Sequence, residues 1–148
     1  MIALSRRETL LGLAATFLPL PVSATPSEVA NSIAAIFGDR PIAEGPIKLE
    51  LPPLAETGNS VPLTVICETQ ALGRVRRLAV FTEMNPRPLA CLASFGPMAA
   101  EARITTNIRL ASTQAVVCVA ELEDGKLISS RQRVRVVVGA CTTLPGRY

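Results

Sequence analysis

Residues 114–138 have the sequence QAVVCVAELEDGKLISSRQRVRVVV, in which two valine-rich runs flank an Asp-Gly pair. Asp124-Gly125 favours a tight hairpin turn, because both residue types accept the positive φ angles that such turns need. We therefore predict strands at 114–122 and 126–138 that pair in antiparallel fashion. A chain with such a hairpin contains an antiparallel sheet.

Short runs rich in Val, Ile, Leu and Thr continue this pattern toward the N-terminus, separated by Pro, Gly, Asn and Asp. In one run Val61, Leu63, Val65 and Cys67 alternate with other residues, which is typical of a strand with one buried face. Further strands are predicted near residues 46–51, 60–68, 76–83, 89–95 and 101–110. Seven strands in about 95 residues indicate an all-β fold, an immunoglobulin-like β-sandwich.

The segment before the first strand favours a short helix. Thr25 can cap the first turn, and Pro26 suits its first position. Apolar residues then recur at helical spacing, and Gly38 is a typical C-terminal stop. We predict a helix over about residues 26–37.

Residues 1–24 have the pattern of a twin-arginine signal peptide. The Arg6-Arg7 pair is followed by an apolar stretch that runs to Val22, and Ala24 suits the position before a signal-peptidase cut. About 13 apolar residues, broken by prolines, are too few to cross a bilayer, which needs roughly 20. We therefore expect export to the periplasm by the twin-arginine route, with no membrane span after cleavage.

Removal of this segment would leave 124 of the 148 residues, enough for one domain. The loss of Arg6, Arg7 and Glu8 would lower the formal net charge from +3 to +2, and the chain has no Trp and one Tyr. So small a charge with so few aromatic side chains predicts no nucleic-acid partner. We place the folded domain at 25–138 and a C-terminal arm and tail at 139–148.

The sequence contains no histidine. This removes the usual general base, the Ser-His and Cys-His pairs of nucleophilic enzymes, and the commonest metal ligand. We therefore expect neither self-contained hydrolytic catalysis nor a metal site. In an oxidising compartment the four cysteines, at positions 67, 91, 118 and 141, become candidates for structural disulfides or for function.

Cys67 and Cys118 both lie within apolar predicted strands and are expected to point inward. Two inward cysteines on opposed sheets could form a disulfide worth about 2–4 kcal/mol. They could equally be buried thiols that act as small hydrophobic side chains. Cys91 is expected in the core or at a strand edge, and the sequence does not choose among the possible pairings.

Short motifs follow one another in a characteristic order from the end of the helix onward. They are FGDRPI (37–42), KLELP (48–52), GNSVPLTV (58–65), VF (80–81), NPRP (85–88), IRLA (108–111), VV (116–117), VAE (119–121), DG (124–125) and GAC (139–141). In this order the chain resembles the SoxY family, the sulfur-carrying subunits of the bacterial thiosulfate-oxidising system. A twin-arginine signal peptide is also typical of that family.

The resemblance implies a periplasmic, immunoglobulin-like carrier rather than an enzyme, paired as a heterodimer with a second β subunit, SoxZ. In that family the cysteine of a C-terminal Gly-Gly-Cys-Gly-Gly arm holds sulfur intermediates covalently while separate periplasmic sulfur-oxidising enzymes act on them. Cys141 matches that cysteine, and Gly139 and Ala140 belong to the arm. No cofactor is implied beyond a covalent sulfur adduct on Cys141. From Val138 an extended chain reaches Cys141 in about 10 Å, enough for the thiol to stand clear of the domain.

The arm departs from the family pattern, because Ala140, Thr142 and Thr143 replace glycines and residues 144–148 follow. Threonines make an arm stiffer than glycines do. An unassisted thiol is mostly protonated at neutral pH, so partners would have to activate it. Two alternatives therefore stand beside the carrier. One is a divergent paralogue that carries another group or none, and the other is an exported structural or interaction module with only structural cysteines.

Two groups of arginines are interpreted first as solvated surface. They are Arg131, Arg133 and Arg135, which alternate along the last predicted strand, and Arg74, Arg76 and Arg77 near a turn. The first group could also attract an anionic sulfur species or an acidic partner. Asn85-Pro86-Arg87-Pro88 is interpreted as a rigid turn first and as an interface second.

Overall fold

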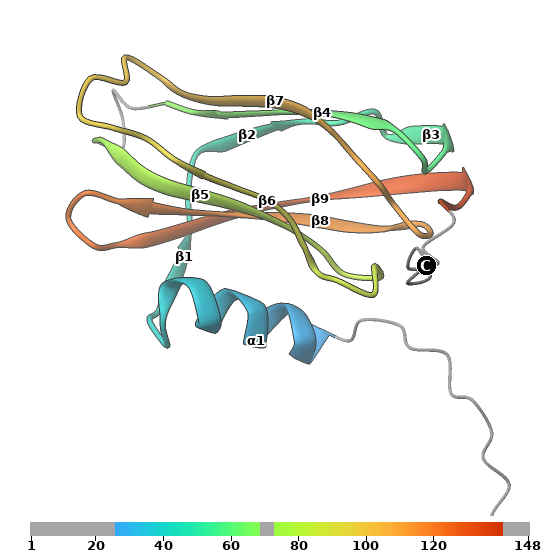
Figure 1. Cartoon of the computed structure of the whole chain (residues 1–148), viewed down its shortest axis with the longest axis horizontal. Coiled ribbons are helices and arrows are strands. Elements are labelled where there is room, and N and C mark those ends of the chain that lie inside the picture. The colour runs from blue at the N-terminus through green and yellow to red at the C-terminus, as the bar shows by residue number, and fades with distance from the viewer. Residues whose placement is uncertain (1–25, 69–72, 141–148) are drawn as a thin grey trace, which may run out of the picture.

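A computed structural model describes residues 26–68 and 73–140 of the chain. These residues form two stacked β-sheets, with one helix packed beneath the larger sheet (Figure 1). This mostly-β architecture confirms the predicted immunoglobulin-like sandwich. The predicted signal peptide, the helix cap Thr25 and the predicted attachment residue Cys141 lie outside the described residues.

One helix and nine strands follow one another along the described part of the chain. They are α1 (Pro26–Phe37), β1 (Ile42–Glu44), β2 (Ile47–Glu50), β3 (Leu54–Thr57), β4 (Val61–Cys67), β5 (Val75–Thr82), β6 (Leu89–Ser94), β7 (Ala102–Ile108), β8 (Gln114–Leu122) and β9 (Leu127–Val138). Among the described residues, no helix has the length and apolar character needed to cross a membrane.

The larger sheet has the strand order β1-β9-β8-β5-β6, and β3 pairs with the end of β9. The smaller sheet has the order β2-β4-β7, with antiparallel pairing throughout. The predicted Asp124-Gly125 hairpin joins β8 and β9. Gly125 has a φ of 87°, and the Leu122 N–H donates to the Lys126 carbonyl at 2.9 Å.

All seven strands expected from the sequence are present, but β1 and β3 were not predicted. They have three and four residues and lie among prolines at positions 41, 46, 52 and 53. Both pair in parallel with β9, and every residue of β1 is exposed. Backbone pairing at a sheet edge needs no alternation of apolar side chains, so the sequence pattern does not reveal such strands.

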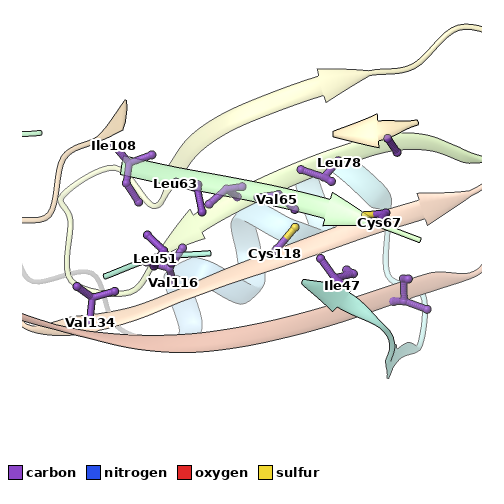
Figure 2. Packing of buried hydrophobic residues seen from close by; sticks show 14 of the residues in the cluster. Ile47, Leu51, Leu63, Val65, Cys67, Leu78, Ile108, Val116, Cys118 and Val134 are labelled. Atoms are coloured by element: carbon purple, nitrogen blue, oxygen red, sulfur yellow. The ribbon is translucent and has the colours of Figure 1, made fainter. Parts of the chain in front are cut away.

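The core lies between the two sheets. The predicted buried face of β4 is confirmed, because Val61, Leu63, Val65 and Cys67 are at most 1% exposed. Figure 2 shows Leu63, Val65 and Cys67 on the side that faces residues of the larger sheet such as Val116. Fully burying side chains of this size contributes about 1.5–3 kcal/mol each, so this face holds the two layers together.

Helix α1 covers part of the outer face of the larger sheet. Its Val29 and Phe37 are buried in one cluster with sheet residues that include Phe81 of β5. Gly38 ends the helix as predicted, with a φ of 81° and an N–H that donates to the Ala34 carbonyl at 2.8 Å. The helix therefore forms a second, smaller apolar cluster outside the sandwich.

A buried carboxylate lies beside this cluster. Glu121 of β8 is 5% exposed and accepts hydrogen bonds from Arg77 Nε at 2.6 Å and from Arg40 Nη2 at 2.7 Å. The Arg77 guanidinium also lies 5.3 Å from the centre of the Phe37 ring and donates to the Ile36 carbonyl at 3.3 Å. The hydrogen bond from Arg77, assisted by Arg40, lowers the pKa of Glu121 to about 2.

Arg77 therefore differs from the solvated residue expected, because its guanidinium binds Glu121 although its side chain is 34% exposed. Arg77 lies directly opposite Glu121 and, by strand alternation, shares the face of Ala79 and Phe81 beneath α1. Arg74 and Arg76 remain exposed, as expected. The register shift between Val75 and Arg77 instead turns Val75 into the core between the sheets. The sequence indicates neither the helix that covers this face nor the distant partner Glu121.

Candidate functional site

Three of the four cysteines, Cys67, Cys91 and Cys118, are free thiols in the core region. Cys91 and Cys118 both pair with Val80 of β5, so they lie in one row across the larger sheet, while Cys67 approaches from the smaller sheet. Figure 2 shows the Cys67 and Cys118 sulfurs among the core side chains. Of the two alternatives for this pair, the structure has the buried thiols and not the disulfide.

Burial makes these thiols poor nucleophiles. It raises the pKa of Cys67 to about 11, and it raises the pKa of Cys91 and, most strongly, of Cys118. Because the thiolate is the reactive form, burial makes all three less reactive than an exposed thiol at neutral pH. In the described ranges, no group of three or more Cys, Asp or Glu residues could hold a metal ion.

The two arm residues that precede Cys141 are packed on the domain. Ala140 is 7% exposed, and its N–H donates to the Leu110 carbonyl at 2.9 Å. Gly139 lies so close to the β7–β8 loop that a Cβ there would be 2.0 Å from the Ala111 carbonyl oxygen. We expected both residues to belong to a projecting arm, whereas the structure holds the chain against this loop as far as Ala140.

The turn between β3 and β4 provides a second contact. The Gly58 N–H donates to the Val138 carbonyl at 2.7 Å, and the Gly58 carbonyl accepts from the Leu110 N–H at 2.8 Å. A Cβ at Gly58 would lie 2.0 Å from the Leu110 oxygen and 2.9 Å from the Ala140 nitrogen. We call residues 138–140 the arm root, because they join β9 to the predicted arm and contact both the turn and the loop.

The loop that holds the arm root is itself fixed by two amide side chains. Asn85 donates from Nδ2 to the Arg109 carbonyl at 2.7 Å, and its Oδ1 accepts from the Ala111 N–H at 2.9 Å. Gln114, which is 3% exposed, donates to Asn85 Oδ1 at 2.9 Å and accepts from the Met84 N–H at 2.7 Å. These contacts connect the β5–β6 turn to the β7–β8 loop, which lie at the same end of the sandwich in Figure 1.

Asn85 begins the NPRP motif, which forms the predicted turn between β5 and β6. The Thr82 N–H donates to the Pro88 carbonyl at 2.8 Å across this turn. The sequence indicated the turn but not the contact of Asn85 with the β7–β8 loop. An asparagine in a proline-rich turn is expected to be exposed, so the sequence does not reveal hydrogen bonds to residues 24 to 29 positions away.

The arginine row lies on β9, away from the core. Arg131, Arg133 and Arg135 are exposed, as expected for a solvated strand face, and Arg131 pairs with Glu83 at 2.7 Å. Exposed ion pairs of this kind contribute little to stability. An attraction of the row for anionic sulfur species or an acidic partner stays a prediction.

Comparisons with known proteins bear directly on this site. The family model described as "Sulfur oxidation protein SoxY" matches residues 33–141, so the match includes the arm root and reaches Cys141. Among solved structures, the chain is similar to the sulfur carrier protein SoxY from Chlorobium limicola f thiosulfatophilum. The two are 30% identical with a TM-score of 0.67, and the alignment covers 76% of this chain and 98% of that chain. A search of curated proteins found no match.

Two more distant structural matches share the fold. The superoxide reductase (neelaredoxin) from Ignicoccus hospitalis is 16% identical with a TM-score of 0.52, over 78% of this chain and 95% of that chain. A putative superoxide reductase from Thermotoga maritima is 16% identical with a TM-score of 0.51, over 61% of this chain and 84% of that chain. At this level of identity the likeness concerns the sandwich alone.

Proposed function

Because the chain belongs to the SoxY family of sulfur carriers, we propose that it holds sulfur intermediates covalently on Cys141 while separate enzymes act on them. The observation that best supports this role is the distribution of the cysteines. Cys67, Cys91 and Cys118 are buried or half-buried with raised pKa values, whereas Cys141 follows directly after the anchored arm root. Cys141 is therefore the cysteine to which the carrier role is assigned.

Loading of thiosulfate onto a thiolate is an oxidation. The Cys141 sulfur would form an S–S bond with the sulfane sulfur, giving a cysteine S-thiosulfonate and releasing two electrons. A separate redox enzyme would have to accept both electrons. With no histidine in the chain, this enzyme would also have to promote loss of the thiol proton.

The proposal includes location and partners. Residues 1–24 would direct export to the periplasm by the twin-arginine route, which moves folded proteins. A SoxZ-like subunit would bind the folded domain as a heterodimer, and periplasmic sulfur-oxidising enzymes would use the arm in turn. An exported module whose cysteines are all disulfide-bonded receives no support, because three of them are free thiols.

Complementation tests this function. A host that lacks the gene would receive the full-length chain as wild type, Cys141→Ser or Cys91→Ser, and thiosulfate oxidation would be measured together with copurification of the SoxZ-like subunit. We expect Cys141→Ser to abolish oxidation and to keep the partner, whereas Cys91→Ser keeps both. Normal oxidation by Cys141→Ser would contradict the proposal.

A further inference from the structure

We propose that Asn85 is a positioning residue that fixes the arm root, residues 138–140, and so sets the place from which Cys141 leaves the domain. The functional part of this inference rests on the proposed carrier role of Cys141. The residue lies in the β5–β6 turn, far from the arm in sequence, and acts through the backbone of the β7–β8 loop.

The Asn85 side chain forms hydrogen bonds with the backbone on both sides of Leu110. Its Nδ2 donates to the Arg109 carbonyl at 2.7 Å, and its Oδ1 accepts from the Ala111 N–H at 2.9 Å. The Leu110 side chain between them is fully buried. Both peptide groups that flank Leu110 are therefore fixed by one side chain, and this leaves the Leu110 backbone little freedom.

A second set of hydrogen bonds runs from Leu110 to the arm root. The Leu110 carbonyl accepts from the Ala140 N–H at 2.9 Å, and the Leu110 N–H donates to the Gly58 carbonyl at 2.8 Å. Gly58 in turn donates to the Val138 carbonyl at 2.7 Å. A continuous set of hydrogen bonds thus leads from Asn85 through Leu110 to both ends of the arm root.

The backbones of the arm root, the β3–β4 turn and the β7–β8 loop pack too closely to allow another arrangement. At Gly58 and at Gly139 a Cβ would lie 2.0 Å from a carbonyl oxygen, far inside contact distance. The three backbones therefore touch without side chains between them, and a shift of one requires a shift of the others. The arm root cannot slide along the loop while Asn85 holds Leu110.

Gln114 fixes the orientation of the Asn85 amide. Its buried Nε2 donates to Asn85 Oδ1 at 2.9 Å, while its Oε1 accepts from the Met84 N–H at 2.7 Å. Asn85 Oδ1 must therefore be the acceptor side, so its Nδ2 faces the Arg109 carbonyl. An aspartate at position 85 could still accept from the Ala111 N–H and from Gln114 Nε2, but it could not donate to the Arg109 carbonyl. Asn85→Asp is therefore expected to have a smaller effect than Asn85→Ala.

A fixed arm root has a consequence for a carrier. Cys141 follows Ala140 directly in the sequence, so the predicted arm begins at this junction. An enzyme that reaches the Cys141 sulfur must therefore approach the rim formed by the β3–β4 turn and the β7–β8 loop. A defined starting point for the arm also reduces the entropy that is lost when the thiol enters an active site.

Amide hydrogen exchange of the mature chain tests directly whether Asn85 fixes Leu110 and the arm root. In Asn85→Ala we expect the Ala140 and Leu110 amides to exchange at least about tenfold faster than in the wild type, because the three hydrogen bonds of the Asn85 side chain are lost. Amides of the central strands, such as those of Val80 and Val119, should keep their protection. Asn107→Ala is the matched control, because Asn107 is exposed on β7 and its side chain makes no hydrogen bond within the described residues.

A nitroxide attached to Cys141 gives the second readout. Its spectrum should sharpen in Asn85→Ala, change less in Asn85→Asp, and stay at the wild-type line shape in Asn107→Ala. If Asn85→Ala loses protection throughout, Asn85→Asp decides the question: the Ala140 and Leu110 amides should exchange faster while the central strands keep their protection. An unprotected Ala140 amide in the wild type, or equal exchange there in the Asn85 and Asn107 variants, would overturn the inference. If Cys141 never bears sulfur, the proposed carrier role fails. The exchange rates of Ala140 and Leu110 would still differ between the variants as predicted, so the two failures are distinguishable.

Discussion

Glu121 lies beside the C-terminal end of α1, where Arg77 and Arg40 bind its carboxylate at 2.6 and 2.7 Å. Its side chain is 6% exposed, so the pair of arginines compensates for the water that the carboxylate loses on folding. Arg77 also contacts Phe37 and the Ile36 carbonyl of the helix. A single charged residue of β8 thereby ties the helix to the outer face of the larger sheet.

The acid stability of the chain should depend on Glu121. Its pKa is lowered to about 2 from an ordinary value of 4.5, so its stabilising effect is complete above about pH 5 and is lost as the pH falls toward 2. We expect Glu121→Gln to lower the free energy of unfolding by about 2–3 kcal/mol at pH 7 and by much less at pH 2.5. Urea unfolding at both pH values measures this difference.

The matched control is Glu123→Gln. Glu123 lies two residues further along, is exposed, and faces Arg74 at 3.8 Å. An exposed pair of this kind contributes about 0–1 kcal/mol, so the control should behave nearly as the wild type at both pH values. A pH-independent loss in Glu121→Gln would contradict the account, because it would show that the substitution disturbs packing and not the charge.

At the scale of elements, the arm root is a junction of three segments. The end of β9, the β3–β4 turn and the β7–β8 loop meet through the backbones of Val138, Gly58 and Leu110. Both Gly58 and Gly139 leave no space for a side chain. The junction therefore depends on glycine for close approach of backbones, whereas a flexible arm would use glycine for freedom of its own.

Gly58→Ala should destabilise the domain. The added Cβ would lie 2.0 Å from the Leu110 oxygen, so the turn or the loop must move and the hydrogen bonds to Val138 and Leu110 weaken. We expect the free energy of unfolding to fall by about 1–3 kcal/mol. Gly96→Ala is the control, because a Cβ at Gly96 has no atom within 4 Å, and its effect should stay within about 0.5 kcal/mol. Equal stability of the two variants in urea titrations would show that the junction tolerates displacement.

For the whole molecule, the sandwich was largely predictable because its strands alternate and their turns have typical residues. The Asp124-Gly125 hairpin and the buried face of β4 are examples, and the family match confirms the resemblance found in the order of the motifs. β1 and β3 were missed because edge pairing to β9 leaves no such pattern. The role of Arg77 was missed because its partners, Glu121 and the end of α1, are distant in sequence.

The candidate site was predictable in part. The sequence placed Cys67 and Cys118 in the core, but it could not decide between a disulfide and free thiols, because that depends on geometry. It assigned Gly139 and Ala140 to the arm, yet their contacts with Leu110 and Ala111 join segments distant in sequence. Contacts of backbone with backbone are independent of side-chain type, and for that reason only the structure reveals them.

The central claim is that Cys141 carries the sulfur cargo, and mass spectrometry of the chain from its native periplasm tests it most directly. The protein would be taken from cells oxidising thiosulfate, kept free of reductant, and digested so that the peptide with Cys141 separates from those with Cys67, Cys91 and Cys118. We predict sulfane or thiosulfonate adducts on the Cys141 peptide alone, removed by reductant. A Cys141 that is always unmodified, or is bonded to one of the other three cysteines, would contradict the account.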